Sequence, residues 1–247
     1  MDHLWIDKYR PKKVNEINTH ETIIQLLFKM KENNSISNLL CYGPSGCGKT
    51  TTIIAYSNEL YGKLAKLNTM IINASDERGI NTIREKIIKF IQTKPLLELK
   101  NNNVPKKMLI LDEADYMMED AQYAITNIMD EYPNVLFVFI CNYIYKIHPV
   151  IQSRCLTLHF GSIEIPHIKE IMLNIIKKEN INISKDAIQL LCELSNNDLR
   201  TSMYMLQTIH SSSKRVTPTN IYKYNQYPTD FQINKIVEIV QTQSIKV

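Results

Sequence analysis

The feature that most constrains the fold is a glycine-rich segment between two apolar stretches. Residues 43–50 read Gly-Pro-Ser-Gly-Cys-Gly-Lys-Thr and match the phosphate-binding pattern G-x-x-x-x-G-K-S/T in full. Residues 38–42 predict a buried strand before this segment, and residues 49–60 predict a helix after it. This order directs backbone N–H groups and the positive end of a helix at phosphate oxygens. We therefore predict a P-loop that binds ATP, with a chance match in a glycine turn as the alternative.

Each residue of this loop has a predicted role. The glycines let the backbone approach phosphate oxygens closely, since a side chain would block the approach. Lys49 is placed to reach the β- and γ-phosphates, and the hydroxyl of Thr50 is placed to ligate Mg²⁺. The predicted nucleotide-binding residues of this segment are Gly43, Pro44, Ser45, Gly46, Cys47, Gly48, Lys49, Thr50 and Thr51.

An acidic pair follows a second apolar stretch. Residues 108–111 predict a buried strand that leads into Asp112 and Glu113. We expect Asp112 to hold Mg²⁺ through its waters and Glu113 to orient or deprotonate the attacking water. The alternative, a pair of surface acids that cap a helix, is disfavoured by the P-loop upstream. Residues 112–115 also spell the string that names the DEAD helicases, but those need a second RecA-like domain, whereas the pattern after Gly161 is helical.

The remaining apolar runs predict an α/β fold. Hydrophobic strands that alternate with helices indicate a parallel sheet covered on both faces. With the two strands above, the sheet has five, and residues 1–161 form a RecA-like domain. The further strands are expected over residues 69–73, 135–141 and 156–160, and the further helices over residues 81–93 and up to Glu131.

After Gly161 the pattern becomes purely helical. Ser184 and Asp198 are suitable N-caps for two of these helices. We expect a small helical lid over residues 162–226 and the start of a further domain over residues 227–247. The predicted helices cover residues 166–179, 184–195, 198–210 and 231–240.

Composition adds only broad limits. The net charge of +4 is a mild basic excess that does not by itself predict nucleic-acid binding. The sequence lacks an apolar run of about 18 residues and an apolar signal-peptide core, so we expect a soluble intracellular protein without membrane association. The 5 cysteines lack metal-ligand spacing and predict buried or free thiols rather than a metal site.

Five short segments besides the P-loop occur in a characteristic order. They are Trp-Ile-Asp-Lys-Tyr-Arg-Pro at residues 5–11, Asn-Ala-Ser-Asp-Glu-Arg-Gly-Ile at 73–80, Ile-Cys-Asn-Tyr at 140–143, Gln-Ser-Arg-Cys at 152–155 and Asn-Asp-Leu-Arg at 197–200. Together they resemble the small subunits of replication factor C, an AAA+ clamp loader. Asn197 stands where that family usually has Gly, and Asn tolerates a left-handed backbone better than other residues.

The resemblance implies further roles at the nucleotide. Ile6 and Arg10 would line its adenine side, with a solvated charge as the alternative for Arg10. Asn142 would contact the γ-phosphate or the attacking water, unless it only ends a strand, and Arg200 would close on the γ-phosphate. Arg154 would act in trans, as an arginine finger at the ATP of a neighbouring subunit. The implied catalytic residues are Lys49, Glu113, Asn142, Arg154 and Arg200.

The resemblance also implies macromolecular partners. Phosphates of primer–template DNA would be gripped without base readout, with a solvated helix face as the alternative. The DNA-binding positions would be Arg78, Arg84 and Lys146. The end of the helix near Phe90, Ile91, Pro95 and Leu96 would dock on a sliding clamp of the proliferating cell nuclear antigen type, with core packing as the alternative.

The implied function is ATP hydrolysis that drives loading of the sliding clamp onto primed DNA during replication. The cofactors would be ATP and Mg²⁺, and the protein would act with other clamp-loader subunits at a nuclear or viral replication site. The family continues into a helical collar domain, of which residues 227–247 would be a shortened beginning. The alternative within the same complex is a structural subunit that binds ATP but hydrolyses little.

Overall fold

The computed structural model describes residues 4–33, 35–75, 80–93, 107–213 and 215–242. The chain divides into two compact units, which are described separately. The sheet unit spans Arg10–Ile163. The helical unit contains the described residues before Arg10 and those from Glu164 onward.

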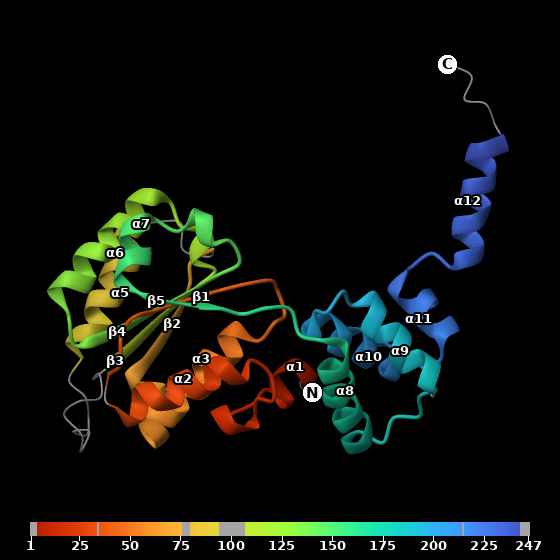
Figure 1. Cartoon of the computed structure of the whole chain (residues 1–247), viewed down its shortest axis with the longest axis horizontal. Helices are drawn as coiled ribbons and strands as arrows, with labels where there is room; N and C mark the ends of the chain where they lie inside the picture. Colours follow the sequence, from red (N-terminus) through yellow and green to blue (C-terminus); the bar gives the residue numbers. More distant parts are fainter. Residues whose placement is uncertain (1–3, 34, 76–79, 94–106, 214, 243–247) are drawn as a thin grey trace. The chain divides into compact units, whose positions relative to one another are not determined.

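The sheet unit is built on five parallel strands in the order β2-β3-β4-β1-β5 (Figure 1). Cys41 of β1 is in register with Ile140 of β4 on one side and with Leu158 of β5 on the other. The loop after β1 therefore leaves the sheet between the ends of β4 and β5. The strands are β1 (Leu39–Tyr42), β2 (Thr69–Asn73), β3 (Lys107–Asp112), β4 (Val135–Cys141) and β5 (Leu156–His159). This confirms the predicted five-stranded parallel sheet.

Helices cover both faces of the sheet, which explains why the three inner strands β3, β4 and β1 consist mainly of buried apolar residues. The helices α2 (Glu21–Glu32) and α3 (Lys49–Tyr61) lie on one face, and α5 (Ile80–Gln92), α6 (Glu119–Glu131) and α7 (Pro149–Arg154) lie on the other (Figure 1). Short elements connect these parts: η1 (Val14–Glu16), η2 (Gly62–Leu64), α4 (Ala65–Asn68), η3 (Ala114–Tyr116) and η4 (Ile144–Lys146).

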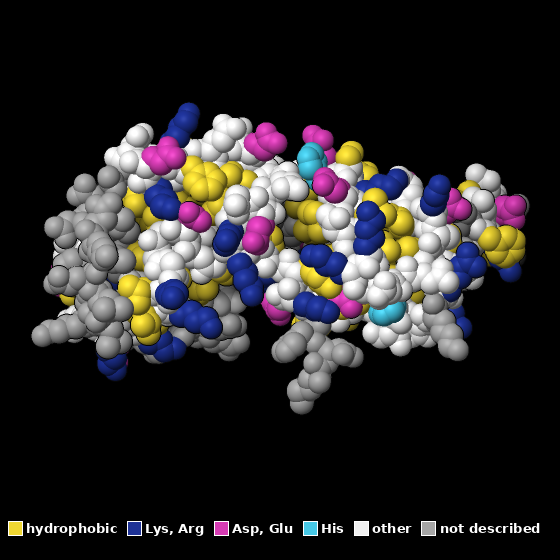
Figure 2. Space-filling view, turned by 90° about the horizontal axis from the view of Figure 1, so that it is seen from below, with side chains coloured by type: hydrophobic (Ala, Val, Ile, Leu, Met, Phe, Trp, Pro, Cys, Tyr) yellow, Lys and Arg dark blue, Asp and Glu magenta, His cyan; other side chains and the backbone are white. Residues whose placement is uncertain are grey.

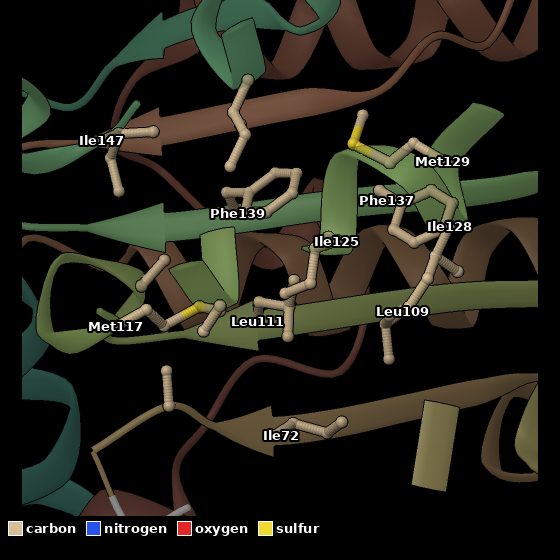
Figure 3. Packing of buried hydrophobic residues seen from close by; sticks show 14 of the residues in the cluster. Ile72, Leu109, Leu111, Met117, Ile125, Ile128, Met129, Phe137, Phe139 and Ile147 are labelled. Carbon is tan, nitrogen blue, oxygen red and sulfur yellow. The ribbon is translucent and has the colours of Figure 1, made fainter. Parts of the chain in front are cut away.

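The main core lies between the sheet and α6. Phe137 and Phe139 of β4 are fully buried and pack with Leu109 of β3 and with Ile125 and Ile128 of α6 (Figure 3). Side chains of this size each contribute roughly 1.5–3 kcal/mol when they leave water. This packing holds the carboxyl ends of β1, β3 and β4 rigidly beside one another.

The helical unit contains α1 (Trp5–Lys8), α8 (Ile165–Lys178), α9 (Lys185–Leu194), α10 (Leu199–Ser212), α11 (Pro218–Asn225) and α12 (Asp230–Thr242). Both predicted N-caps are confirmed, because Ser184 Oγ accepts from Ala187 N at 3.3 Å and Asp198 Oδ1 accepts from Thr201 N at 3.0 Å.

The prediction of three helices in the lid was wrong, because α11 adds a fourth between Asp198 and Tyr227. This helix has 8 residues, and Ile221 is its buried hydrophobic side chain, so it has little apolar periodicity. Its start is nevertheless marked locally: Thr217 Oγ1 accepts from Asn220 N at 3.4 Å, and Pro218 occupies the first turn.

The N-terminal segment packs within the helical unit. Trp5 N donates to Gln207 Oε1 at 2.9 Å, and the Trp5 ring lies 5.5 Å from the ring of His210. Glu179, after α8, accepts hydrogen bonds from Lys8 and Tyr9. Residues 4–9, which we predicted as part of the RecA-like domain, are thus tied to α8 and α10; the three domain limits stay predictions.

Three further observations concern the surface, the helices and the cysteines. On the face in view in Figure 2, basic and acidic side chains are interspersed. In the part of the chain that the structure describes, no helix is both long and apolar enough to cross a membrane. All five cysteines are free thiols, and burial raises the pKa of Cys141 and of Cys155 to about 12, so both are protonated at neutral pH.

Candidate functional site

The P-loop leaves the end of β1 in a backbone conformation that requires glycine. Gly43 has a φ of 150°, and a Cβ there would lie 1.9 Å from the backbone oxygen of Phe160. Gly48 has a φ of 95° and is the N-cap of α3, which begins at Lys49. The N-terminus of a helix, with its free N–H groups, therefore lies at the loop, as anion binding requires.

Lys49 is held over this loop rather than in solvent. Its side chain is 8% exposed, and Nζ donates to Gly43 O at 2.8 Å and to Pro44 O at 2.7 Å. It also donates to Asn142 Oδ1 at 2.9 Å, although 93 residues separate the two in sequence. A buried ammonium needs such acceptors. The fold thus joins two separately predicted residues at the phosphate-binding loop.

The predicted magnesium ligands are also in contact. Thr50 Oγ1 donates to Asp112 Oδ2 at 2.9 Å, which connects the first turn of α3 with the end of β3. Among the described residues, no group of three or more histidine, cysteine or acidic side chains could hold a metal ion. A hydroxyl and one carboxylate nevertheless fit Mg²⁺, which in nucleotide sites is bound by one or two carboxylates together with waters and phosphate oxygens.

Glu113 turns away from the strand in a strained conformation. Its φ of 55° and ψ of 38° are left-handed, which is uncommon for a residue other than glycine. Its N–H donates to Asp112 Oδ1 at 3.0 Å. Successive side chains of a regular strand point to opposite faces, and this turn breaks that alternation directly after Asp112. Both carboxylates can then serve one site, and such strain is typical of functional positions.

Asp115 is a site residue that the sequence reasoning did not assign. It is 6% exposed, and its Oδ2 accepts from Asn142 N at 3.4 Å. Its Oδ1 has no hydrogen-bond partner within the described part of the chain. Asn142 is therefore held through its backbone by Asp115 and through its side chain by Lys49. The sequence did carry a signal for Asp115, since it is a third acidic residue two positions after Glu113. We interpreted this residue only as part of a helicase-like string.

His20 was also missed, and here the sequence carries no signal. Its Nε2 lies 3.0 Å from Cys47 O, where it must donate, and its ring meets Phe160 edge-on at 5.0 Å. His20 precedes α2 in a left-handed conformation with a φ of 57°. It supports the P-loop from the side of β5.

Arg154 lies on a different surface of the sheet unit. At the end of α7, its Nη1 donates to Asp130 Oδ1 at 2.5 Å and to Thr126 O at 3.1 Å, so the guanidinium is bound to α6. The side chain is 36% exposed. These contacts place it on the exterior of the sheet unit.

The described DNA and clamp residues of the prediction lie on α5 and η4. Arg84 on α5 and Lys146 on η4 are exposed. Phe90 and Ile91 are half-buried, and Ile91 packs against the core, which favours the core-packing alternative for this residue. Three predicted residues lie outside the described part of the chain: Arg78, Pro95 and Leu96.

The remaining predicted nucleotide contacts are divided between the units. Arg10 and Thr51 are half-buried in the sheet unit. In the helical unit, Ile6 is half-buried on α1, and Arg200 is exposed in the first turn of α10. Their roles at the nucleotide stay predictions.

Comparison with known proteins agrees with this geometry. The family model for the ATPase family associated with various cellular activities (AAA) matches residues 39–161, and the model for the RFC1-like AAA+ ATPase lid domain matches residues 165–223. "Thermotoga maritima RuvB Holliday junction branch migration motor" has a similar structure, with a TM-score of 0.66 over 94% of this chain and 79% of that chain. At 15% identity this likeness shows the fold alone.

Several relatives in sequence are more informative. "Probable replication factor C subunit 5" of Dictyostelium discoideum is 38% identical over 95% of this chain and 67% of its own length. "Replication factor C small subunit" of Methanococcus vannielii is 36% identical over 97% of this chain and 75% of its own. "Replication factor C subunit 5" of Homo sapiens is 34% identical over 97% and 69%. Across the relatives, the chain spans from 64% to 75% of their length.

Proposed function

Because the chain belongs to the replication factor C family of AAA ATPases, which act in DNA replication, we propose that it hydrolyses Mg²⁺-bound ATP to help load a sliding clamp onto primed DNA. The observation that carries this proposal is a double contact at the start of α3. Lys49 meets Asn142, which follows β4, and Thr50 meets Asp112 at the end of β3, so two strand ends converge on the end of the P-loop.

Binding would use the P-loop and the start of α3. The phosphates would meet the N–H groups of residues 43–50 and the positive end of the helix. The ammonium of Lys49 would exchange the carbonyls of Gly43 and Pro44 for β- and γ-phosphate oxygens. This exchange keeps a buried cation paired throughout. Thr50 and Asp112 would hold Mg²⁺, which neutralises charge on the phosphate oxygens when bound.

Hydrolysis would depend on Glu113 and Asn142. Glu113 accepts a proton from water as the water oxygen bonds to the γ-phosphorus and the bond to the β-phosphate oxygen breaks. Asn142 positions the γ-phosphate or that water, since Asp115 and Lys49 fix its backbone and side chain. Arg154 would stabilise the transition state of a neighbouring subunit's ATP, and its attachment to α6 at the surface supports this role.

Partners enter as part of the same proposal. The other subunits of a hetero-oligomeric clamp loader would supply the neighbouring sites. Arg84, Lys146 and Arg78 would contact DNA phosphates, and the end of α5 would contact the sliding clamp. The complex would work where DNA is replicated, in the nucleus or at a viral replication site.

Reconstitution tests the proposal directly. The chain is purified with its native partner subunits, and ATP hydrolysis is measured with and without primed DNA and clamp, together with retention of the clamp on circular DNA. We expect DNA and clamp to stimulate hydrolysis and loading to require ATP. Clamp loading that proceeds equally well with a chain unable to hydrolyse ATP would instead identify a structural ATP-binding subunit.

A further inference from the structure

A pocket of about 510 Å³ lies at the carboxyl edge of the sheet, beside the P-loop. One wall comes from the P-loop and another from the turn that follows β4. Its lining residues are Tyr42, Gly43, Pro44, Ser45, Asn142, Tyr143, Ile144, Tyr145 and His159. A volume of this order suits a small aromatic group rather than a folded protein segment.

Aromatic rings dominate this pocket. Tyr42 and His159 are stacked with their ring centroids 4.8 Å apart. Tyr143 and Tyr145 form a second, tilted pair at 5.6 Å, and they are 50% and 75% exposed. Large rings held at the surface beside a hollow offer flat faces on which another planar group can stack.

A cation lies among the exposed rings. The ammonium of Lys146 is 5.2 Å from the centroid of Tyr143 and 5.6 Å from that of Tyr116. Tyr116 is itself 61% exposed. The short turns η3 and η4 therefore present three tyrosine rings and one ammonium together, next to the pocket.

We propose that this pocket receives an unpaired base of a DNA strand, which stacks on Tyr145 and Tyr143 while an adjoining phosphate meets Lys146. Aromatic faces combined with a cation are what single-stranded nucleic acids require, because every base has a π-face and every nucleotide a phosphate. The proposal rests on the proposed function in taking DNA as the partner, and it adds that the contact is with an unpaired base.

Fluorescence of a base analogue tests this contact. The full chain, with its partner subunits, is titrated with primer–template DNA that carries 2-aminopurine as the first unpaired template base. We expect quenching on binding, since stacking on a tyrosine ring quenches this base. Tyr145→Leu should remove most of the quenching and weaken binding about 5- to 100-fold, the equivalent of roughly 1–3 kcal/mol per stacked base. Tyr143→Leu should act in the same direction.

Matched controls separate stacking from general damage. Tyr204→Leu replaces a tyrosine that is 58% exposed on α10 of the helical unit, and it should leave the quenching unchanged. Lys146→Gln should lower the slope of log affinity against log salt by about one unit while quenching at saturation persists. Circular dichroism of each variant confirms folding.

The outcomes also separate this inference from the proposed function. Equal quenching by wild type and Tyr145→Leu overturns the stacking site, even if ATP and fully paired DNA still bind. A further outcome concerns free nucleotide. If free 2-aminopurine ribonucleotide displaces the oligonucleotide at a concentration similar to that of the oligonucleotide itself, the pocket is a site for free nucleotides, and the inference is overturned. A wild-type protein that binds neither paired nor unpaired DNA would overturn the DNA part of the proposed function as well.

Discussion

Lys49 in the sheet unit is 8% exposed and bonded to two loop carbonyls and to Asn142, whereas Arg200 in the helical unit is exposed on the first turn of α10. Both residues are predicted to meet the γ-phosphate. The first is held in place by hydrogen bonds at the loop, and the second lies in the first turn of a 14-residue helix on a separate unit. We therefore expect the chemistry to depend mainly on the sheet unit and the helical unit to modulate it.

Within the helical unit, α12 contrasts with the helices that precede it. Every side chain of α12 whose exposure is described is exposed, and among them are Phe231 at 76% and Val240 at 64%. By comparison, Leu191 on α9 and Leu206 on α10 are fully buried. An apolar helix that covers no core of its own fits the predicted start of a further domain, which stays a prediction.

The largest effect should come from Lys49→Ala. The substitution removes the ammonium that the P-loop holds for the phosphates, so we expect no measurable ATP binding by calorimetry. Lys66→Ala, at an exposed position of α4, is the control and should bind normally. Unchanged ATP affinity of Lys49→Ala would contradict the expectation that the sheet unit provides the main contacts to the nucleotide.

Arg154→Ala should come next. We expect this chain's own ATP affinity to remain, while hydrolysis at the neighbouring subunit falls by about 10³- to 10⁵-fold, as for other arginine fingers supplied in trans. Single-site hydrolysis in complexes of mutant and wild-type subunits measures this. The control is Asp130→Asn, which breaks the same surface ion pair but keeps the guanidinium of Arg154. In this variant we expect normal ATP hydrolysis at the neighbouring subunit. A defect at the chain's own site would mean that Arg154 acts in cis.

Glu113→Gln should separate binding from chemistry. The amide keeps the shape of the side chain but cannot take a proton, so we expect normal ATP affinity and a turnover about 10²- to 10⁴-fold lower. Glu85→Gln on α5 is a matched control on the same unit. Normal turnover of Glu113→Gln in the assembled complex would exclude Glu113 as the base.

Arg200→Ala measures the contribution of the helical unit. Loss of one charge-assisted hydrogen bond corresponds to roughly 1.5–3 kcal/mol, so ATP affinity or turnover should fall about 10- to 100-fold. Equilibrium binding and turnover are compared with those of Arg215→Ala, an exposed position of the same unit. A loss as large as that of Lys49→Ala would mean that both units are equally essential.

The smallest effect concerns the attachment of the N-terminal segment. Hydrogen bonds from Lys8 and Tyr9 lower the pKa of Glu179, so the ionised form stabilises the folded state. This contribution is complete above the unfolded-state pKa and is lost as pH falls through the lower folded-state value. Glu179→Gln should therefore reduce the fall in melting temperature from about pH 7 to about pH 3.5. Glu170→Gln on α8 serves as the control, and an identical pH profile for both variants would contradict the assignment.

Local patterns were enough for much of the fold. The strands at residues 69–73 and 135–141 were predicted with their exact limits. Residues 135–141 are a continuous apolar run, as is typical of a buried parallel strand, and β2 at the sheet edge was marked by three apolar residues between Thr69 and Asn73. The caps Ser184 and Asp198 were predictable because capping joins residues three positions apart. α11 was not predicted, because a short helix with little buried surface shows little apolar periodicity in its sequence.

The sequence by itself determined the P-loop, the acidic pair and the parallel sheet, since each depends on neighbouring residues whose chemistry is visible in order along the chain. Only the tertiary structure decided the strand order, and with it the contacts between strand ends. It placed Asn142 on Lys49, Asp115 behind Asn142 and His20 against the P-loop, all across long stretches of chain. It also gathered Tyr116, Tyr143 and Lys146 beside one pocket. Such contacts follow from the packing of the core that aligns the carboxyl ends of the strands, and no local pattern encodes them.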